Sequence, residues 1–276
     1  MSIMKSVLII SLVLGFSAVS LAKDNAQLIQ QRTSFQQAQK ALETHQLDRF
    51  NSLRDKLHDY PLQPYLDYLY LRHRLHLTNN RTISQFIQEN PNTFYGDRLR
   101  NSWLNQLAKN KEWSQFLNYF PASASASQQC LRLDALLATG NAKQALAETP
   151  TLWLVGYSQD KTCDSAFQYW QSQGLLTNEL RWQRIQLALN ENQFSLAKFI
   201  AKSLDSHHQA HTWIPLWEQS HNQPLSLLQQ RTTSALKIDH AISRDIIKHA
   251  IGRLSRKSTA QAYAYWQTIR SKYQFS

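Results

Sequence analysis

Two glutamates beside tryptophans are the residues of this sequence whose surroundings best suit acid/base chemistry. Glu179 lies three residues before Trp182, and Glu218 directly follows Trp217. An apolar neighbour raises the pKa of a carboxyl group, which a general acid needs near neutral pH. Neither glutamate has a second titratable group at a useful spacing, so we interpret both as solvated positions at helix rims and predict no catalytic residue.

A cluster of histidines has spacing that could suit a metal ion. His207 and His211 would lie on one face of a helix, with His208 between them and His221 within reach in sequence. No Glu or Cys stands at a useful spacing, and the segment has the polar composition of a connection between helices. Solvated histidines are therefore the favoured interpretation. With no glycine-rich phosphate loop either, we expect neither a metal nor a cofactor.

The N-terminal segment has the features of a cleaved secretory signal. A positively charged start precedes the apolar residues 7–16, and Ser20 and Ala22 are the small residues that signal peptidase prefers. The apolar run is shorter than the roughly 20 residues needed to span a bilayer. We therefore expect a signal peptide at residues 1–22 and an exported mature chain at 23–276 that has no membrane span.

The two cysteines, Cys130 and Cys163, are the next candidates for chemistry. In an exported protein the default expectation for such a pair is a disulfide, because compartments outside the cytoplasm are oxidising. The bond would stabilise the fold by about 3–4 kcal/mol if its effect is to restrict the unfolded chain. Metal ligation and two free thiols are the alternatives.

The charge balance predicts an anionic partner. The chain has 30 Lys and Arg against 19 Asp and Glu, which gives a formal net charge of +11. An exported destination argues against nucleic acid and favours envelope polymers that carry carboxylates or phosphates. The basic clusters are Arg72 with Arg74, Arg98 with Arg100, and residues 253–257, although solvated helix faces commonly look the same.

Helical periodicity dominates the chain. Apolar residues recur at three- and four-residue steps in the windows 193–204 and 242–254. Thr82 and Gln85 have the spacing of a capping box and predict a helix that begins at Thr82, and Asn90 before a proline predicts its end.

The breaks between these windows suggest short helices joined in pairs. Gly140, Gly174 and residues 190–192 interrupt the periodicity at intervals suited to helices of roughly 10–15 residues. No alternating run is long enough for a strand. The sequence therefore predicts an all-α fold, an irregular α-solenoid of antiparallel helix pairs, as one superhelical domain over residues 23–276.

A set of stretches then carries a family resemblance through its order and spacing. The stretches are Asp59–Tyr68; Asn90-Pro91 with Arg98–Ala108 and Trp113; Leu152–Gln159; Cys163–Phe167 with Trp170; and Arg184–Leu189. Together they resemble the superhelical, U-shaped domain of soluble lytic transglycosylases over essentially the whole mature chain. The resemblance implies a periplasmic location, peptidoglycan as the partner, and a bonded pair of cysteines at Cys130 and Cys163, where the family places one.

One departure from that family affects the expected activity. Its enzymes carry a lysozyme-like domain in which a Glu followed by Ser is the acid/base, and no glutamate of this sequence precedes a serine. We therefore expect a chain that is non-catalytic by itself, or a truncated product, which associates weakly with peptidoglycan. The candidate glycan-binding residues are Arg72, Arg74, Arg98 and Arg100. The alternative is a solenoid adaptor that binds an envelope protein.

Overall fold

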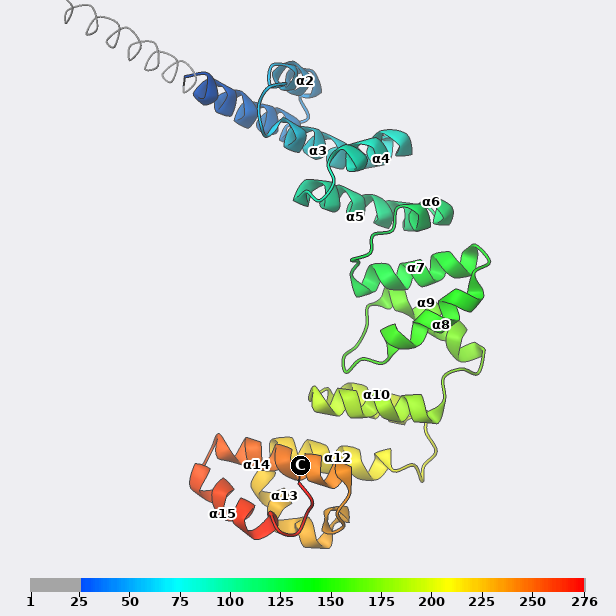
Figure 1. Cartoon of the computed structure of the whole chain (residues 1–276), viewed down its shortest axis with the longest axis vertical. Helices are drawn as coiled ribbons and strands as arrows, with labels where there is room; N and C mark the ends of the chain where they lie inside the picture. The colour runs from blue at the N-terminus through cyan, green and yellow to red at the C-terminus, as the bar shows by residue number, and fades with distance from the viewer. Residues whose placement is uncertain (1–25, 276) are drawn as a thin grey trace, which may run out of the picture. The chain divides into compact units, whose positions relative to one another are not determined.

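The computed structural model describes residues 26–275, and every regular element in that range is a helix (Figure 1). The chain separates into two compact units, with the boundary between Glu112 and Trp113. The all-α prediction is confirmed. The signal peptide predicted at residues 1–22 lies outside the described residues. Within the described range, no helix is both long enough and apolar enough to cross a bilayer.

The N-terminal unit consists of a helix over residues 26–43 and four further α-helices. They are α2 (Leu47–Asp55), α3 (Gln63–His73), α4 (Asn80–Glu89) and α5 (Phe94–Lys109), with a short 3₁₀ turn, η1 (Leu75–Leu77), after α3. The first three helices bury Phe35, Phe50 and Leu66 together. Trp103 of α5 is fully buried and donates its indole N–H to Asn80 Oδ1 at 2.8 Å, which fixes α4 against α5.

The C-terminal unit continues the same theme with ten α-helices. They are α6 (Trp113–Asn118), α7 (Ala126–Ala138), α8 (Ala142–Trp153), α9 (Asp164–Ser172), α10 (Asn178–Asn190), α11 (Phe194–Ala201), α12 (Ala210–Asn222), α13 (Pro224–Gln230), α14 (Ala241–Ser255) and α15 (Thr259–Ile269). Three 3₁₀ turns interrupt the series: η2 (Lys161–Cys163), η3 (Arg231–Thr233) and η4 (Ala235–Lys237). Each helix packs mainly on its neighbours in the chain, as in a solenoid.

One type of turn closes four of the helical hairpins. At His45, Lys111, Gly140 and Asn192 the backbone enters the left-handed region, with φ between 58° and 82°. In each case the next residue donates its N–H to a carbonyl five residues earlier, for example Asn141 to Leu136 at 2.8 Å. This is the Schellman arrangement, which satisfies the last carbonyls of a helix and reverses the chain. The predicted break at Gly140 is one of these turns, although only this one of the four uses glycine.

Five of the labelled α-helices, α4, α5, α7, α10 and α15, begin with a side-chain cap. Thr93, Ser125 and Thr177 each accept a hydrogen bond from the amide three residues ahead. The capping box predicted at Thr82 is wrong, because Asn79 is the cap of α4. Its side chain accepts from the Thr82 amide at 2.9 Å and also from the Thr82 hydroxyl, so the helix begins a turn earlier than the sequence pattern indicated.

Candidate functional site

The two arginines predicted at α3 both contact tyrosines, but in different ways. Arg72 is exposed and donates to the Tyr68 hydroxyl at 3.3 Å, four residues back on the same helix. Arg74 caps α3, and its guanidinium lies 5.9 Å from the centre of the Tyr70 ring. Residues two apart on a helix point in different directions. Arg72 and Arg74 therefore do not form one continuous basic surface.

The two arginines predicted on α5 differ in exposure and in pairing. Arg98 is exposed, and within residues 26–275 it has no carboxylate partner. Arg100 donates to Asp97 Oδ1 at 2.8 Å, which neutralises part of its charge, and its side chain is only 22% exposed. Arg72 and Arg98 are consequently the two of the four predicted residues whose charge is most available to a polyanion.

The two glutamates that lie beside tryptophan in the sequence each accept a hydrogen bond. Lys198 donates to Glu218 at 2.8 Å and Gln183 donates to Glu179 at 3.3 Å, so both glutamates have polar partners. A different carboxylate, Asp134, has a pKa that is raised by burial, and its two oxygens accept from the Ser165 hydroxyl at 2.7 Å.

Asp67 is the second such carboxylate. Burial raises its pKa, although Arg54, at 3.5 Å, partly opposes the rise. A raised pKa of this kind marks a candidate acid. The carboxylates of Asp55 and Glu89 also raise the pKa of Asp67 and line the same cleft, whereas no second carboxylate among the described residues contributes to the raised pKa of Asp134.

The histidines are divided among separate contacts. His208 Nδ1 accepts from the Ala210 amide at 3.1 Å, and its ring packs edge-on to Trp182. A pair that the sequence did not reveal is formed by His221 and His249, whose ring nitrogens are 3.2 Å apart. Burial lowers the pKa of each imidazole, and Arg253 and Arg256 lower both further; for His249 the neighbouring His221 ring contributes after burial and before these arginines. Within the described part of the chain, no three potential ligands gather around a metal position.

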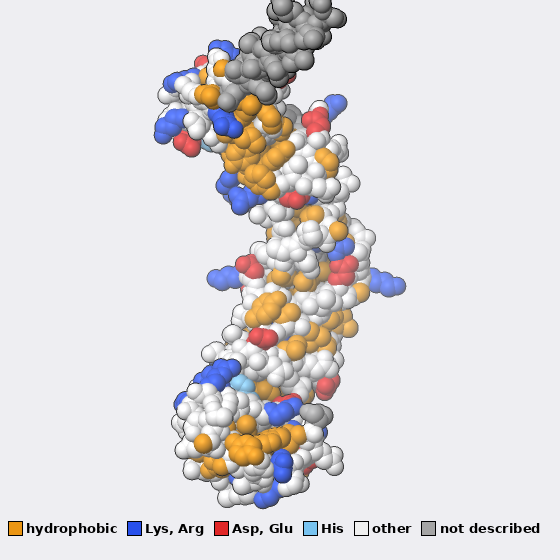
Figure 2. All heavy atoms as spheres, turned by 60° about the vertical axis from the view of Figure 1, so that its left-hand side comes forward, with side chains coloured by type: hydrophobic (Ala, Val, Ile, Leu, Met, Phe, Trp, Pro, Cys, Tyr) orange, Lys and Arg blue, Asp and Glu red, His pale blue; other side chains and the backbone are white. Residues whose placement is uncertain are grey.

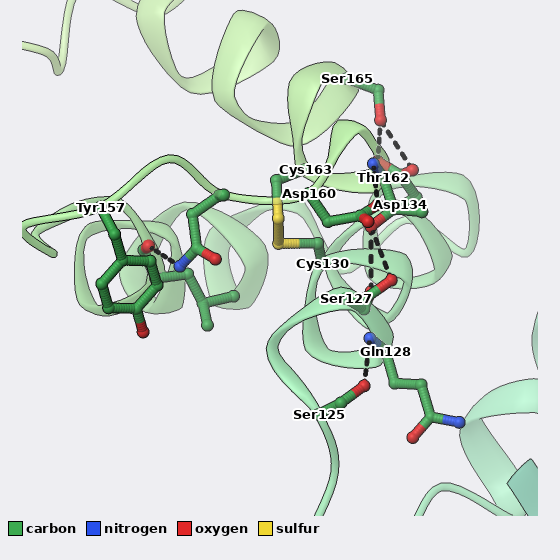
Figure 3. The surroundings of a disulfide bond; sticks show 12 residues. Ser125, Ser127, Gln128, Cys130, Asp134, Tyr157, Asp160, Thr162, Cys163 and Ser165 are labelled. Atoms are coloured by element: carbon green, nitrogen blue, oxygen red, sulfur yellow. Dashed lines mark hydrogen bonds between the residues drawn. A yellow bond between two sulfur atoms is a disulfide. The ribbon is translucent and has the colours of Figure 1, made fainter. Parts of the chain in front are cut away.

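The predicted disulfide joins Cys130 of α7 to Cys163 of η2, with an S–S distance of 2.01 Å (Figure 3). Both cysteines are fully buried. Beside the bond, the hydroxyls of Ser127 and Thr162 lie 3.0 Å apart, and Asp160 accepts from the Thr162 amide to begin η2. The prediction from sequence is confirmed, and the bond fixes one end of the loop between α8 and η2.

That loop, residues 154–160, is also held at its centre and at its start. Gly156 lies directly on the backbone of α10, where a Cβ would come within 2.5 Å of the Leu187 carbonyl oxygen. Gln159 donates to the Leu152 carbonyl at 2.6 Å. Only a residue without a side chain permits this close approach. These contacts hold the loop in a fixed position against α10.

In this position the loop brings the Tyr157 carbonyl within hydrogen-bond distance of a buried arginine, Arg184. Arg184 of α10 is 5% exposed, and its Nη2 donates to the Tyr157 oxygen at 3.2 Å. Its guanidinium lies 4.5 Å from the centre of the Trp153 ring, in cation–π contact. Among the described residues no carboxylate pairs with it, and its Nε is buried with no acceptor. Burial lowers its pKa to about 10, so it stays charged at neutral pH.

Arg184 lies at the wall of a cleft of about 730 Å³ that is formed by one face each of α9, α10 and α11. This volume is within the range of small-ligand sites, about 300–1,000 Å³. Arg181 and Lys202 also line it, against a single carboxylate, that of Asp164. Phe199 at its edge is 70% exposed. The sequence analysis missed this site, because its parts come from four separate segments and Arg184 lies outside the basic clusters named from the sequence.

These features define a class of protein, an all-α solenoid of helical hairpins with a disulfide and a basic cleft in its C-terminal unit. No protein-family model matches the chain. The soluble lytic murein transglycosylase of Escherichia coli K12 is 28% identical over 183 residues, which are 66% of this chain and 28% of that protein. Its counterpart from Salmonella typhimurium is 27% identical over 238 residues, 85% of this chain and 36% of the relative.

Solved structures agree with the sequence relatives. An inactive mutant of the lytic transglycosylase Slt from Pseudomonas aeruginosa is 29% identical with a TM-score of 0.70, covering 88% of this chain and 39% of that one. The 70-kDa enzyme of Escherichia coli has the same TM-score at 24% identity, which supports the fold alone. The chain is thus related to soluble lytic transglycosylases, and it spans about a third of the length of the curated relatives it matches.

Proposed function

We propose that this chain is a periplasmic peptidoglycan-associating solenoid, acting in cell-wall turnover through binding and not through bond cleavage of its own. The observation that carries the proposal is its similarity, over 85% of its residues, to a soluble lytic murein transglycosylase. The net charge of +11 adds a physical reason, because peptidoglycan stem peptides carry carboxylates. The predicted signal at residues 1–22 supports the location.

The strength of the association should depend on salt. Exposed charges are screened within roughly 8–10 Å near physiological ionic strength, so contacts made by Arg72 and Arg98 should weaken steeply as salt rises. A few exposed contacts give affinities on the order of millimolar. Weak, salt-sensitive binding is therefore the expected behaviour.

Pelleting of the protein with purified sacculi across a salt series tests this proposal. The Arg72→Glu/Arg98→Glu variant should leave more protein in the supernatant than the matched Lys143→Glu/Lys237→Glu variant, which changes the net charge equally at exposed positions outside the predicted cluster. Equal pelleting of the two variants would show that Arg72 and Arg98 do not contribute to the binding of peptidoglycan. Pelleting that is equal at all salt concentrations would reject an electrostatic association.

Digestion of sacculi tests the absence of cleavage by this chain alone. The proposal expects no anhydro-muropeptides, since no glutamate precedes a serine. Asp67→Asn and Asp134→Asn are the informative variants, because burial raises the pKa of both carboxyl groups. Release of anhydro-muropeptides that is lost in either variant would show that the chain is itself an enzyme.

An exposed aromatic surface on the N-terminal unit favours the alternative, a protein-binding adaptor. Phe94, 62% exposed, contacts the rings of Tyr65 and Tyr95, and Leu62, three residues before Tyr65, is 49% exposed. Figure 2 shows hydrophobic side chains gathered on this part of the molecule. Exposed apolar patches of this kind commonly mark protein contacts. If sacculi fail to retain the chain, the adaptor function becomes the better hypothesis.

A further inference from the structure

The cleft beside Arg184 holds a buried positive charge that the protein itself does not neutralise. Arg184 is 5% exposed, has one hydrogen bond through its guanidinium, to the Tyr157 carbonyl, and has no acceptor for Nε. A buried charge is costly unless it is paired, and a neutral carbonyl and an aromatic face compensate only part of that cost. An anion that enters the cleft would supply the missing partner.

The other residues that line the cleft indicate which kind of anion would fit it. Lys202 and Arg181 add positive charge on the walls, while Gln168 and Gln171 of α9 offer side-chain amides. Leu196 and Phe199 of α11 add apolar side chains to the lining. A ligand that fits these surfaces combines a carboxylate with backbone-like amides and small apolar groups. That combination is a short peptide with a free terminal carboxylate.

We propose that the cleft between α9, α10 and α11 binds the carboxylate end of a short peptide, with Arg184 and Lys202 as the groups that hold the carboxylate. The proposal rests on the proposed function, since it names the stem peptide of peptidoglycan as the part of the polymer that this cleft holds. It assigns the specific contact to the C-terminal unit and leaves the exposed arginines of α3 and α5 as a screened, general attraction.

The fixed geometry of the cleft supports a binding site over an accidental hollow. The disulfide between Cys130 and Cys163 and the close approach of Gly156 to α10 hold the loop that bonds Arg184. Trp153 stacks on the same guanidinium. A guanidinium that is already held in place loses little side-chain freedom when it binds a carboxylate, which favours affinity.

The experiment uses N-acetylmuramoyl-L-alanyl-D-isoglutamine, which has one free carboxylate, and its carboxamide, which has none. Titration of the isotope-labelled chain, followed by NMR chemical shifts, should move resonances of α9, α10 and α11 with the carboxylate probe and leave them in place with the carboxamide. Lys202→Glu should weaken binding about 10-fold or more, as expected for loss of a charge-assisted contact. Lys237→Glu, an equal change at an exposed residue outside the cleft, should bind as the unmodified chain does.

Arg184→Gln should abolish the shifts, and Lys202→Glu keeps the test decisive if the buried variant does not fold. Equal binding of the two probes, or equal affinities of Lys202→Glu and Lys237→Glu, would overturn the proposal. Retention on sacculi without any response to the soluble carboxylate would overturn it too, while leaving the proposed function intact. A carboxylate response in the cleft without retention on sacculi would support the cleft and reject the proposed function.

Discussion

The arginines of the two units are in opposite situations. In the N-terminal unit Arg72 and Arg98 are exposed, and their charge is shared with solvent. In the C-terminal unit Arg184 is buried against Trp153, and the described residues give it no counter-charge. Exposed charges in water interact weakly and are screened, whereas a buried charge interacts strongly with whatever is brought beside it. The more numerous arginines therefore provide attraction, and the single buried one can provide specificity.

Loss of the disulfide should produce the largest difference in stability between the two units, because the bond lies within the C-terminal unit. Cys130→Ser/Cys163→Ser removes a cross-link between residues 33 apart in sequence, and the chain-entropy relation gives a loss of about 4 kcal/mol. Hydrogen exchange should then speed up in the helices around the Arg184 cleft and stay unchanged in α5. Equal acceleration in both units would mean that they unfold as one, contrary to the comparison.

Gly156→Ala should be the next largest change. The new Cβ would lie 2.5 Å from the Leu187 carbonyl oxygen, so the loop must move away from α10 and from Arg184. We expect a loss of about 2–3 kcal/mol in the free energy of unfolding, as for an overpacked core. Gly252→Ala is the control, because a Cβ there meets nothing within 4 Å and the exposed position in α14 should gain up to about 1 kcal/mol. Urea unfolding of the two variants measures the difference.

The smallest change in stability should come from substitutions in two hairpin turns, one with lysine and one with glycine in the left-handed conformation. Lys111 and Gly140 adopt φ values of 59° and 82° in turns with the same hydrogen bonds. A side chain in this conformation costs about 1–2 kcal/mol relative to glycine. Lys111→Gly should therefore raise the free energy of unfolding of the N-terminal unit by about 1 kcal/mol, and Gly140→Ala should lower that of the C-terminal unit by a similar amount. Thermal unfolding in which both variants shift in the same direction would contradict this assignment.

The sequence predicted the helices well where one face is apolar, and less well where a single side chain decides. The apolar spacing in residues 193–204 and 242–254 corresponds to α11 and α14, because burial of one face depends on local periodicity. The beginning of α4 was misplaced, because Asn79 and Thr82 are both good caps and only the folded backbone selects one.

The candidate site was harder to predict for a different reason. A search for charged clusters finds Arg98 with Arg100, which are two residues apart in sequence and point in different directions on α5. The surroundings of Arg184 depend on Trp153 and Tyr157, which are 31 and 27 positions away and reach it only through the fold. The family resemblance included all three residues but assigned them no role. What could have signalled the site is the pair Arg181 and Arg184, three residues apart and therefore on one face of α10.

The repeated left-handed turns have a consequence for how such a chain can change over evolution. Each of the hairpins closed at His45, Lys111, Gly140 and Asn192 satisfies its own terminal carbonyls within a few residues of the turn. A hairpin of this kind brings its closing hydrogen bonds with it when it is copied or removed. Duplication or deletion of whole hairpins should therefore be tolerated far better than insertion of a few residues inside one, and related solenoids should differ in length by multiples of a hairpin.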